Sequence, residues 1–189
     1  MIYNRKELKE CLNLENSLYS SYMFPTLKKN VKALIMHTVP RMLWEWQKKS
    51  RKSDYYDYLV QKRGGGFYRF MRFYYDYKKG VLAERLGLEI VTSNIGPGLM
   101  IYHRNNVINS NAIIGKNLKL HGNNVIGNNG ISKEAPIIGD NVRLGIGAKV
   151  IGNIIIANNI TIAAGAVVVH SFVEPSITIA GIPAKKINR

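Results

Sequence analysis

An aliphatic residue recurs at every sixth position through the second half of the chain. The series consists of Ile108, Ile114, Leu120, Ile126, Ile138, Leu144, Val150, Ile156, Ile162 and Val168. A strand repeats every two residues and a helix every 3.6, so neither alone gives a period of six. Short strands joined by tight corners do, when one inward side chain per strand stacks on its counterpart in the next coil. The pattern therefore predicts a parallel β-helix of hexapeptide repeats.

The positions between these aliphatics support the same interpretation. Gly and Asn are frequent where the corners would lie, and both residues tolerate positive φ. The residue four after each aliphatic is often apolar, as at Leu118 and Val142. The one missing aliphatic position is Ser132, within the segment "NNGISKEAP". We expect this segment to be a loop that leaves the repeat without changing its phase.

The first half of the chain has a helical texture. Asn4 is followed three residues later by Glu7, which predicts a capping box. The stretches 41–52 and 53–62 are expected to form two short amphipathic helices, and Gly64–Gly66 predicts a break. We therefore expect a helical region over residues 1–88, a β-helix over 89–175, and a C-terminal tail over 176–189.

Composition limits where such a chain could act. The only cysteine is Cys11, and the longest apolar run, "AAGAVVV", is far too short to span a bilayer. The N-terminus lacks the apolar stretch of a signal peptide, so we expect a cytoplasmic protein. The formal charge of +15 would favour nucleic acid, an anionic membrane surface or anionic substrates, or simply reflect a basic proteome. Without a nucleic-acid-binding motif, we expect no nucleic-acid partner and keep peripheral membrane contact open.

Two of the four histidines, His103 and His121, are eighteen residues apart. The hexapeptides resemble those of the left-handed β-helix, in which three six-residue faces make one coil. The two imidazoles would then occupy equivalent positions in adjacent coils, about 4.8 Å apart, with Gly139 next in the column. A structural corner histidine is the alternative. Because imidazole is the natural general base near neutral pH, we predict a functional site here.

Three segments, "GPGLMIYHRNNVINSNAIIGKN", "PIIGDNVRLGIGAKVIGN" and "ITIAGIPAKKI", resemble the hexapeptide-repeat acyltransferases. The resemblance is greatest to the serine O-acetyltransferase-like branch, which includes enzymes of capsule and exopolysaccharide clusters. It implies a left-handed β-helix that transfers acetyl from acetyl-CoA to a hydroxyl. It further implies a homotrimer with sites shared between subunits and no metal.

The same resemblance implies roles for individual residues. His103 would be the general base, oriented by the carboxylate of Glu89, with backbone N–H groups stabilising the oxyanion. The residues that would contact the pantetheine arm or the phosphates of CoA are Gly145, Ile146, Ala164, Val169, His170, Lys185 and Lys186.

The chain departs from the serine enzymes at the acceptor site. Tyr102 replaces the Asp before the catalytic His, and Glu134 and Ala135 replace an Arg-His pair that handles the amino acid. We therefore predict a saccharide acceptor, free, nucleotide-linked or lipid-linked, in surface polysaccharide biosynthesis. Tyr102 would stack on the sugar ring and His121 would assist in acceptor binding. The alternative is serine O-acetylation in cysteine biosynthesis.

Two further classes of protein share this fold. The zinc carbonic anhydrase requires three histidine ligands, two of them about five residues apart. His37, His103, His121 and His170 include no such pair, which disfavours a metal site. A non-enzymatic scaffold is the other class, and the basic C-terminal segment and His103 argue against it.

Overall fold

The structure, a computed structural model, describes residues 2–23, 26–36 and 38–187. The chain divides into two compact units, Met1–Gly87 and Leu88–Arg189. The division falls one residue before the predicted end of the helical region, because Leu88 already begins the first strand. Each unit is described by itself.

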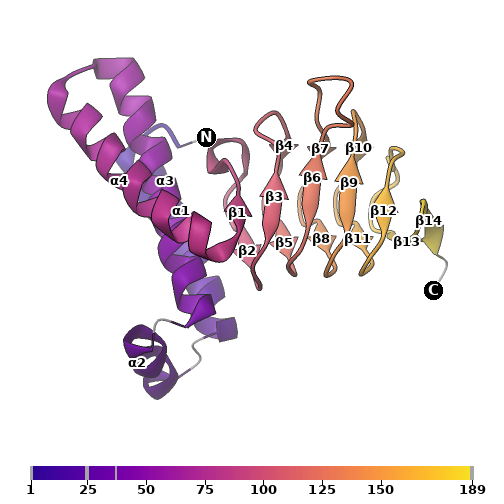
Figure 1. The fold of residues 1–189 in the computed structure, drawn as a ribbon, viewed down its shortest axis with the longest axis horizontal. Coiled ribbons are helices and arrows are strands. Elements are labelled where there is room, and N and C mark those ends of the chain that lie inside the picture. The colour runs from indigo at the N-terminus through magenta and orange to yellow at the C-terminus, as the bar shows by residue number, and fades with distance from the viewer. Residues whose placement is uncertain (1, 24–25, 37, 188–189) are drawn as a thin grey trace. The chain divides into compact units, whose positions relative to one another are not determined.

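The first unit is helical (Figure 1). Its helices are α1 (Arg5–Met23), α2 (Leu27–Ile35), α3 (Val39–Arg63) and α4 (Gly66–Leu86). One half of the predicted capping box is confirmed, because the backbone N–H of Glu7 donates to Asn4 Oδ1. The Glu7 carboxylate accepts from the backbone N–H of Tyr3, one residue before Asn4, and from the side-chain amide of Asn4. The predicted break is also confirmed, since Gly64 and Gly65 both have positive φ between α3 and α4.

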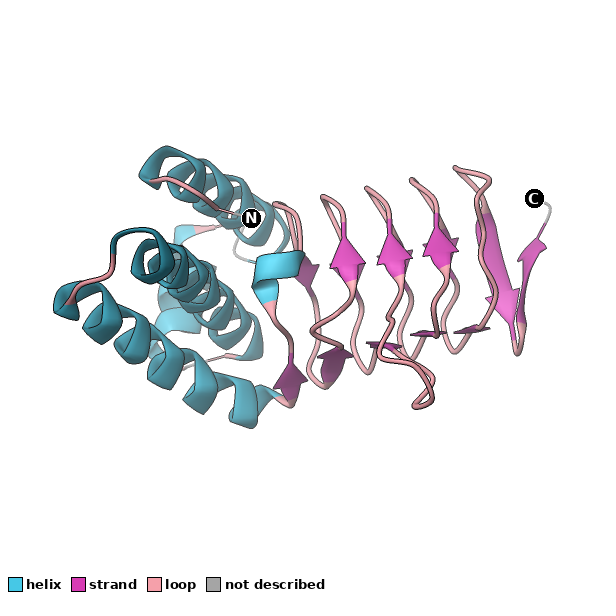
Figure 2. Ribbon diagram, turned by 90° about the horizontal axis from the view of Figure 1, so that it is seen from above, coloured by secondary structure: helices cyan, strands magenta, loops and turns pink. Residues whose placement is uncertain are grey.

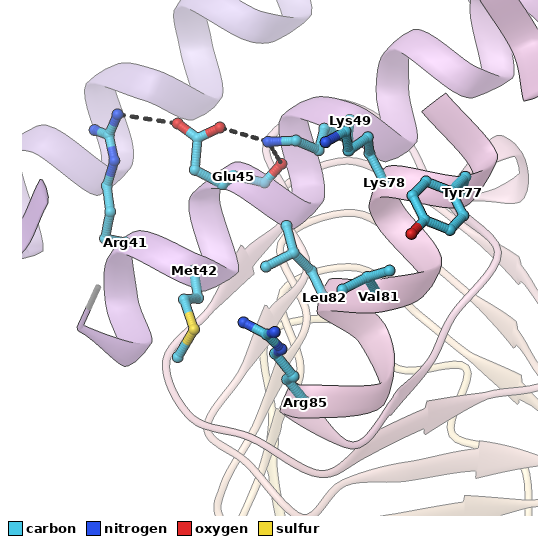
Figure 3. A pocket seen from close by; sticks show the side chains of 9 residues that line it. All are labelled: Arg41, Met42, Glu45, Lys49, Tyr77, Lys78, Val81, Leu82 and Arg85. Carbon is cyan, nitrogen blue, oxygen red and sulfur yellow. Dashed lines mark hydrogen bonds and ion pairs between the residues drawn. The ribbon is translucent and has the colours of Figure 1, made fainter. Parts of the chain in front are cut away.

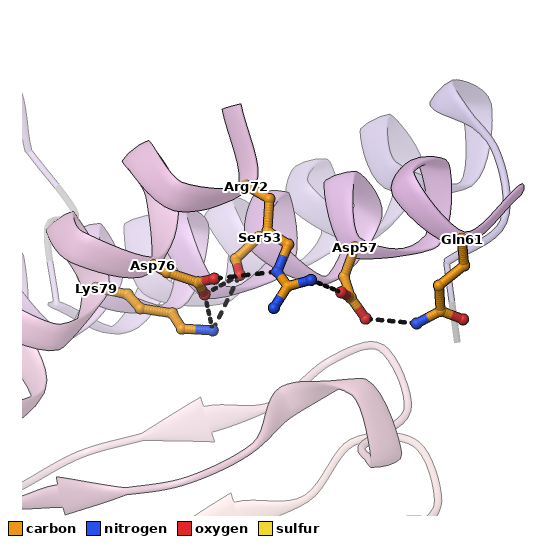
Figure 4. Close-up of polar contacts among 6 residues, drawn as sticks. All are labelled: Ser53, Asp57, Gln61, Arg72, Asp76 and Lys79. Atoms are coloured by element: carbon orange, nitrogen blue, oxygen red, sulfur yellow. Dashed lines mark hydrogen bonds and ion pairs between the residues drawn. The ribbon is translucent and has the colours of Figure 1, made fainter. Parts of the chain in front are cut away.

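The two short helices predicted across residues 41–62 are wrong, because this stretch is one continuous helix, α3. The expected break was at Ser53, a residue that often leaves helices by bonding to nearby backbone. Here the Ser53 hydroxyl instead donates to Asp76 of α4 at 2.6 Å. Asp76 also accepts from Lys79, and Arg72 bridges Asp76 to Asp57 (Figure 4). Asp76 of the neighbouring helix thus provides a hydrogen-bond acceptor for Ser53, a residue that the local sequence alone would place at a helix end.

A buried ion pair lies between α1 and α3. Glu15 and Arg51 are almost fully buried, and Arg51 Nη2 donates to Glu15 Oε1 at 2.8 Å. The nearby Cys11 is buried as well, and burial raises the pKa of its thiol to about 12. This cysteine is therefore a packing residue with almost no thiolate near neutral pH.

The second unit is built from short parallel strands, which lie side by side in successive coils (Figures 1 and 2). The first sheet holds β1 (Leu88–Glu89), β3 (Asn106–Ile108), β6 (Val125–Gly127), β9 (Lys149–Ile151) and β12 (Val167–Val168). The second holds β4 (Ile113–Ile114), β7 (Ile137–Ile138) and β10 (Ile155–Ile156). The third holds β2 (Met100–Ile101), β5 (Lys119–Leu120), β8 (Arg143–Leu144), β11 (Thr161–Ile162), β13 (Thr178–Gly181) and β14 (Ala184–Ile187). A short 3₁₀ turn, η1 (Thr92–Asn94), lies between β1 and β2.

The periodic aliphatics form the core of this unit, as the hexapeptide pattern predicts. All ten members of the series from Ile108 to Val168 are buried, as are Leu118 and Val142. Ile138 pairs with Ile156, eighteen residues on, whereas Leu120 pairs with Leu144, twenty-four residues on. The difference of six confirms that the segment around Ser132 is an ejected loop that keeps the phase of the repeat.

Asparagine defines one of the corners. Asn117, Asn141 and Asn159 have φ values of 60°, 58° and 61°. Their side chains form a ladder along the coils, with Nδ2-to-Oδ1 distances of 2.8 Å and 2.9 Å. The ladder satisfies the exposed amides and holds successive corners in register.

The predicted C-terminal tail is part of the β unit instead. Thr178 of β13 pairs with Thr161 of β11, and Ile179 is fully buried. The last strand, β14, folds back antiparallel on β13. The aliphatic at position 179 thus extends the core for one more coil.

Candidate active site

The corner after β2 contains one extra residue. Ile101 pairs with Leu120, a separation of nineteen, whereas Val107 pairs with Val125, a separation of eighteen. Tyr102, and not His103, is therefore the residue in register with His121. The predicted equivalence of the two imidazoles is wrong, because the extra residue shifts His103 one step along the corner.

The ring of Tyr102 stacks on the ring of His121. Their centroids are 4.4 Å apart and the ring planes are inclined by 15°. The backbone N–H of Tyr102 also donates to Leu120 O at 2.9 Å, and the Tyr102 side chain is buried. A role for Tyr102 in stacking on a sugar ring is not compatible with this burial, since one ring face is covered by His121.

Buried asparagines hold the corner that carries His103. Asn106 Nδ2 donates to the carbonyl oxygen of His103 at 2.8 Å, and Asn106 Oδ1 accepts from the backbone N–H of Asn124. Asn124 Nδ2 in turn donates to Gly145 O at 2.6 Å. Neither asparagine was predicted as a site residue, although their spacing of eighteen is a signal that could have found them. Together they fix the backbone while leaving the His103 side chain exposed.

A groove of about 440 Å³ lies beside this corner. It is lined by His103, His121, Arg143, Gly145, Ile146, Thr161, Ile162, Ala163 and Ala164. The structure thus brings together both histidines and three of the predicted cofactor-binding residues. Arg143 was not predicted. Its place before the inward Leu144 in β8 could have identified it as an outward-facing cation.

Gly145, and not Gly139, follows His121 in the column, because the ejected loop adds six residues. The backbone N–H of His121 donates to Leu144 O at 3.1 Å. A Cβ on Gly145 would lie 2.5 Å from the backbone nitrogen of Ala164. Glycine is therefore required here by the close stacking of two coils, in addition to any approach of a cofactor.

The environment of His121 favours the neutral imidazole. Burial lowers its pKa, and electrostatic interactions with Arg143, His103 and Lys119 lower it further. Its Nε2 atom is buried and finds no hydrogen-bond partner among the residues that the structure describes. Buried polar atoms normally have a partner, so this nitrogen is an exception among the described residues.

The remaining predicted site residues lie outside the groove. Glu89 is exposed on β1, opposite Val107, and within the described chain no hydrogen bond joins it to His103. Val169 and His170 follow β12 and are exposed. Whether these residues take part in catalysis or cofactor binding stays a prediction.

The two lysines predicted to bind phosphate are adjacent in β14, so their side chains point to opposite faces of the strand. Lys186 Nζ is 2.6 Å from Glu174 Oε1, so the charge of Lys186 is compensated by an ion pair. Within the described chain no ion pair involves Lys185, and its side chain is exposed. Lys185 is therefore the better candidate for a CoA phosphate.

A second groove, of about 530 Å³, lies within the helical unit between α3 and α4 (Figure 3). Glu45 lines it and is bound by Arg41 and Lys49, both of which also line it. Burial raises the pKa of Glu45, but hydrogen bonds from Lys48 and Lys49 outweigh this and bring the pKa down to about 2. This groove therefore offers no carboxylate that could act as a base near neutral pH.

Two structural features are absent from the described residues. No group of three or more His, Cys, Asp and Glu side chains in this part of the chain could hold a metal ion. Of the helices described, none is long and apolar enough to cross a membrane.

Comparison with known proteins relates the chain to serine acetyltransferases. No family model matches it. It is 30% identical over 135 residues to the serine acetyltransferase of Buchnera aphidicola subsp. Schizaphis graminum, and the matched region covers 65% of this chain and 51% of the relative. It is 38% identical over 121 residues to the serine acetyltransferase of Staphylococcus aureus, and the matched region covers 58% of this chain and 56% of the relative. The chain thus spans about half the length of the curated relatives it matches.

Solved structures extend the likeness to nearly the whole chain. Soybean serine acetyltransferase matches 95% of this chain and 69% of its own, with a TM-score of 0.70 and 21% identity. The serine acetyltransferase of Neisseria gonorrhoeae in complex with serine matches 97% of this chain and 70% of its own, with a TM-score of 0.69 and 24% identity. At these identities the likeness shows the fold. This likeness is consistent with the predicted left-handed β-helix.

The prediction of a saccharide acceptor in surface polysaccharide biosynthesis is wrong. The sequence relatives and the structural neighbours are consistently named serine acetyltransferases. The prediction relied on the replacement of family residues by Tyr102, Glu134 and Ala135. The structure explains Tyr102 without a sugar, because its ring packs on His121. These comparisons favour the alternative, serine O-acetylation.

Proposed function

We propose that the protein is an acetyl-CoA-dependent O-acetyltransferase whose acceptor is the hydroxyl of L-serine, in cysteine biosynthesis. The observation that carries this proposal is the exposed imidazole of His103 at the edge of a groove that His121 also lines. The names of the sequence relatives support serine as the acceptor. The proposal includes a cytoplasmic location.

In the proposed reaction, the imidazole of His103 takes the proton of the serine hydroxyl as the oxygen attacks the thioester carbonyl. A carbon–oxygen bond forms, and the carbonyl oxygen becomes an oxyanion. The carbon–sulfur bond then breaks, and the imidazolium returns its proton to the leaving thiolate of CoA. The products are O-acetylserine and CoA, and His103 regains its starting state.

Backbone amides of the groove are suited to stabilising the oxyanion. Among the described residues, no acceptor is present for the N–H groups of Ile146 and Ala164, which line the groove in successive coils. Amides held rigidly in a corner need no reorganisation to bind a developing negative charge. We assign these two N–H groups as candidates for the oxyanion or for the amide oxygens of the pantetheine arm.

A homotrimer is the proposed assembly. Ile113, Ile137 and Ile155 are in register on the second sheet and point outward, with exposed fractions of 58%, 43% and 48%. A column of exposed aliphatics on a flat sheet favours contact with another subunit. Three copies related by cyclic symmetry would close such a contact.

The test of the proposed function is a product assay. The protein is incubated with L-serine and acetyl-CoA, and O-acetylserine is measured by mass spectrometry beside free CoA. We expect both products in equal amounts, and loss of both in a His103→Ala variant. Release of CoA at the same rate with and without serine would contradict the proposal.

A further inference from the structure

The proposed acceptor carries a carboxylate, and the groove requires a cation to bind it. A carboxylate that enters a partly apolar groove loses hydration, which costs free energy unless a positive group replaces the water. The lining of the groove is otherwise neutral or weakly basic: two imidazoles, one hydroxyl and several aliphatic or small residues. Arg143 is the guanidinium among these lining residues.

Arg143 lies on the same side of the unit as the proposed base. It occupies the outward position of β8, between Lys119 of β5 and Thr161 of β11 in the register of the third sheet. Gly145, two residues after Arg143, continues the column that contains Tyr102 and His121. The charge of Arg143 is close enough to His121 to act on that imidazole. A strand position of this kind is rigid, so the backbone of Arg143 is held in a fixed position in the wall of the groove that both histidines line.

The guanidinium of Arg143 is available to bind an anion. Within the part of the chain that is described, no ion pair involves Arg143, and its side chain is exposed. By contrast, Lys186 is paired with Glu174, and Arg72 with Asp57 and Asp76. A guanidinium presents parallel N–H groups that match both oxygens of a carboxylate.

The loop around Ser132 contains one lysine, Lys133, but neither Lys133 nor Glu134 is among the residues that line the groove. Glu134 is anionic and bonds to Asn153, and the next residue, Ala135, is apolar and buried. Among the residues that line the groove, Arg143 is therefore the cation placed to attract a carboxylate.

We propose, resting on the proposed serine acetylation, that Arg143 binds the α-carboxylate of the acceptor and thereby orients its hydroxyl toward His103. Arg143 is in this role a specificity-determining residue, and His103 remains the base. The enzyme would then discriminate against hydroxyl compounds that lack a carboxylate.

The experiment compares Arg143→Met and Arg143→Lys with the unaltered protein and with Lys6→Met, which removes one exposed charge from α1. KM and kcat are measured for serine, for serinamide and for acetyl-CoA. For Arg143→Met we expect the KM for serine to rise roughly ten- to a hundredfold, as expected for loss of a charged hydrogen bond. The KM for acetyl-CoA should change less than about twofold, and serinamide should be used equally by both proteins. Arg143→Lys should recover part of the loss, and Lys6→Met should behave as the unaltered protein.

The outcomes separate the two proposals. If the unaltered protein forms no O-acetylserine, the proposed function fails and this inference fails with it. If the unaltered protein is active and Arg143→Met has an unchanged KM for serine, only the inference is overturned. A rise in the KM for acetyl-CoA in place of serine would assign Arg143 to a phosphate of CoA and also overturn it. Thermal melts of each variant verify that the exposed substitution leaves the fold intact.

Discussion

Tyr102 and His121 are stacked partners in adjacent coils, with ring centroids 4.4 Å apart. This contact sets the geometry of the candidate site, because it assigns the two histidines different positions. His121 is half-buried under a tyrosine ring, while His103 occupies the extra step of the corner and remains exposed. An exposed imidazole beside a half-buried imidazole of lowered pKa suits two distinct roles, and the first prediction tests this division.

His103→Ala should reduce turnover roughly 10²- to 10⁴-fold, because it removes the general base. His121→Asn should be milder and should act mainly on the KM for the acceptor, since His121 is assigned to binding. Both variants are measured with serine and acetyl-CoA at saturating and limiting concentrations. Equal loss of kcat in both, with unchanged binding of both substrates, would show that the roles are misassigned.

Gly145→Ala should destabilise the β unit, because the new Cβ would lie 2.5 Å from the backbone nitrogen of Ala164. Overpacking of this kind typically costs about 1–3 kcal/mol. Urea denaturation followed by circular dichroism measures the change. Gly127→Ala is the matched control: like Gly145, Gly127 lies in the β unit without a positive φ, but a Cβ there meets nothing closer than 3.9 Å. A Gly145 variant no less stable than the Gly127 variant would contradict close coil stacking as the reason for glycine.

The pKa of His121 should lie below its ordinary value and should rise in Arg143→Met, which removes a nearby positive charge. Titration of the ring proton signals by NMR measures both, and Lys6→Met should leave the His121 curve unchanged. The sign for stability follows. Since the folded-state pKa is lowered, the folded protein binds fewer protons than the unfolded one between that pKa and about 6.5. This group therefore makes the protein less stable as pH falls through that window, and a slope of opposite sign for its contribution would be inconsistent with the lowered pKa.

Glu15→Gln should strongly destabilise the helical unit. The substitution leaves the buried guanidinium of Arg51 without its counter-ion, a loss that typically costs about 3–5 kcal/mol. Chemical denaturation measures the effect. The control is Glu10→Gln, on the exposed side of the same helix, where the pair with Lys6 is 4.0 Å long and the change should be small. Similar stabilities for the two variants would mean that the Glu15–Arg51 pair is not structurally important.

Shared sites in a trimer can be tested by complementation. A chain with His103→Ala is co-expressed with a chain whose Ala164→Trp substitution fills the groove. If each site combines His103 of one subunit with the Ala164 region of its neighbour, mixed trimers regain some intact sites and activity returns. Ile137→Asp, on the exposed aliphatic column, should lower the mass measured by light scattering. Inactive trimers despite proven mixing, or a monomer in the unaltered protein, would exclude shared sites.

Much of the fold is local information and could be predicted. The burial of every periodic aliphatic from Ile108 to Val168 follows from the period alone. Successive side chains of a strand point to opposite faces, so residues at a fixed period all face inward. The phase-keeping loop around Ser132 follows from the same count. The capping box at Asn4 and Glu7 also involves residues only three apart. Each of these features depends on groups that are close in the sequence.

What only the tertiary structure decided depends on contacts between distant segments. The extra corner residue at His103 becomes visible only when Ile101 is paired with Leu120 across two coils. The continuity of α3 depends on a hydrogen bond from Ser53 to Asp76 on another helix, and Glu15 meets Arg51 thirty-six residues away. Arg143 is forty residues further along the chain than His103. It lines the same groove as His103 because β8 stacks on β5. The sequence by itself therefore determined the repeat and its inward face, since these need only backbone periodicity. The register between coils, and with it the composition of the site, was decided by hydrogen bonding and packing between residues that the sequence does not place together.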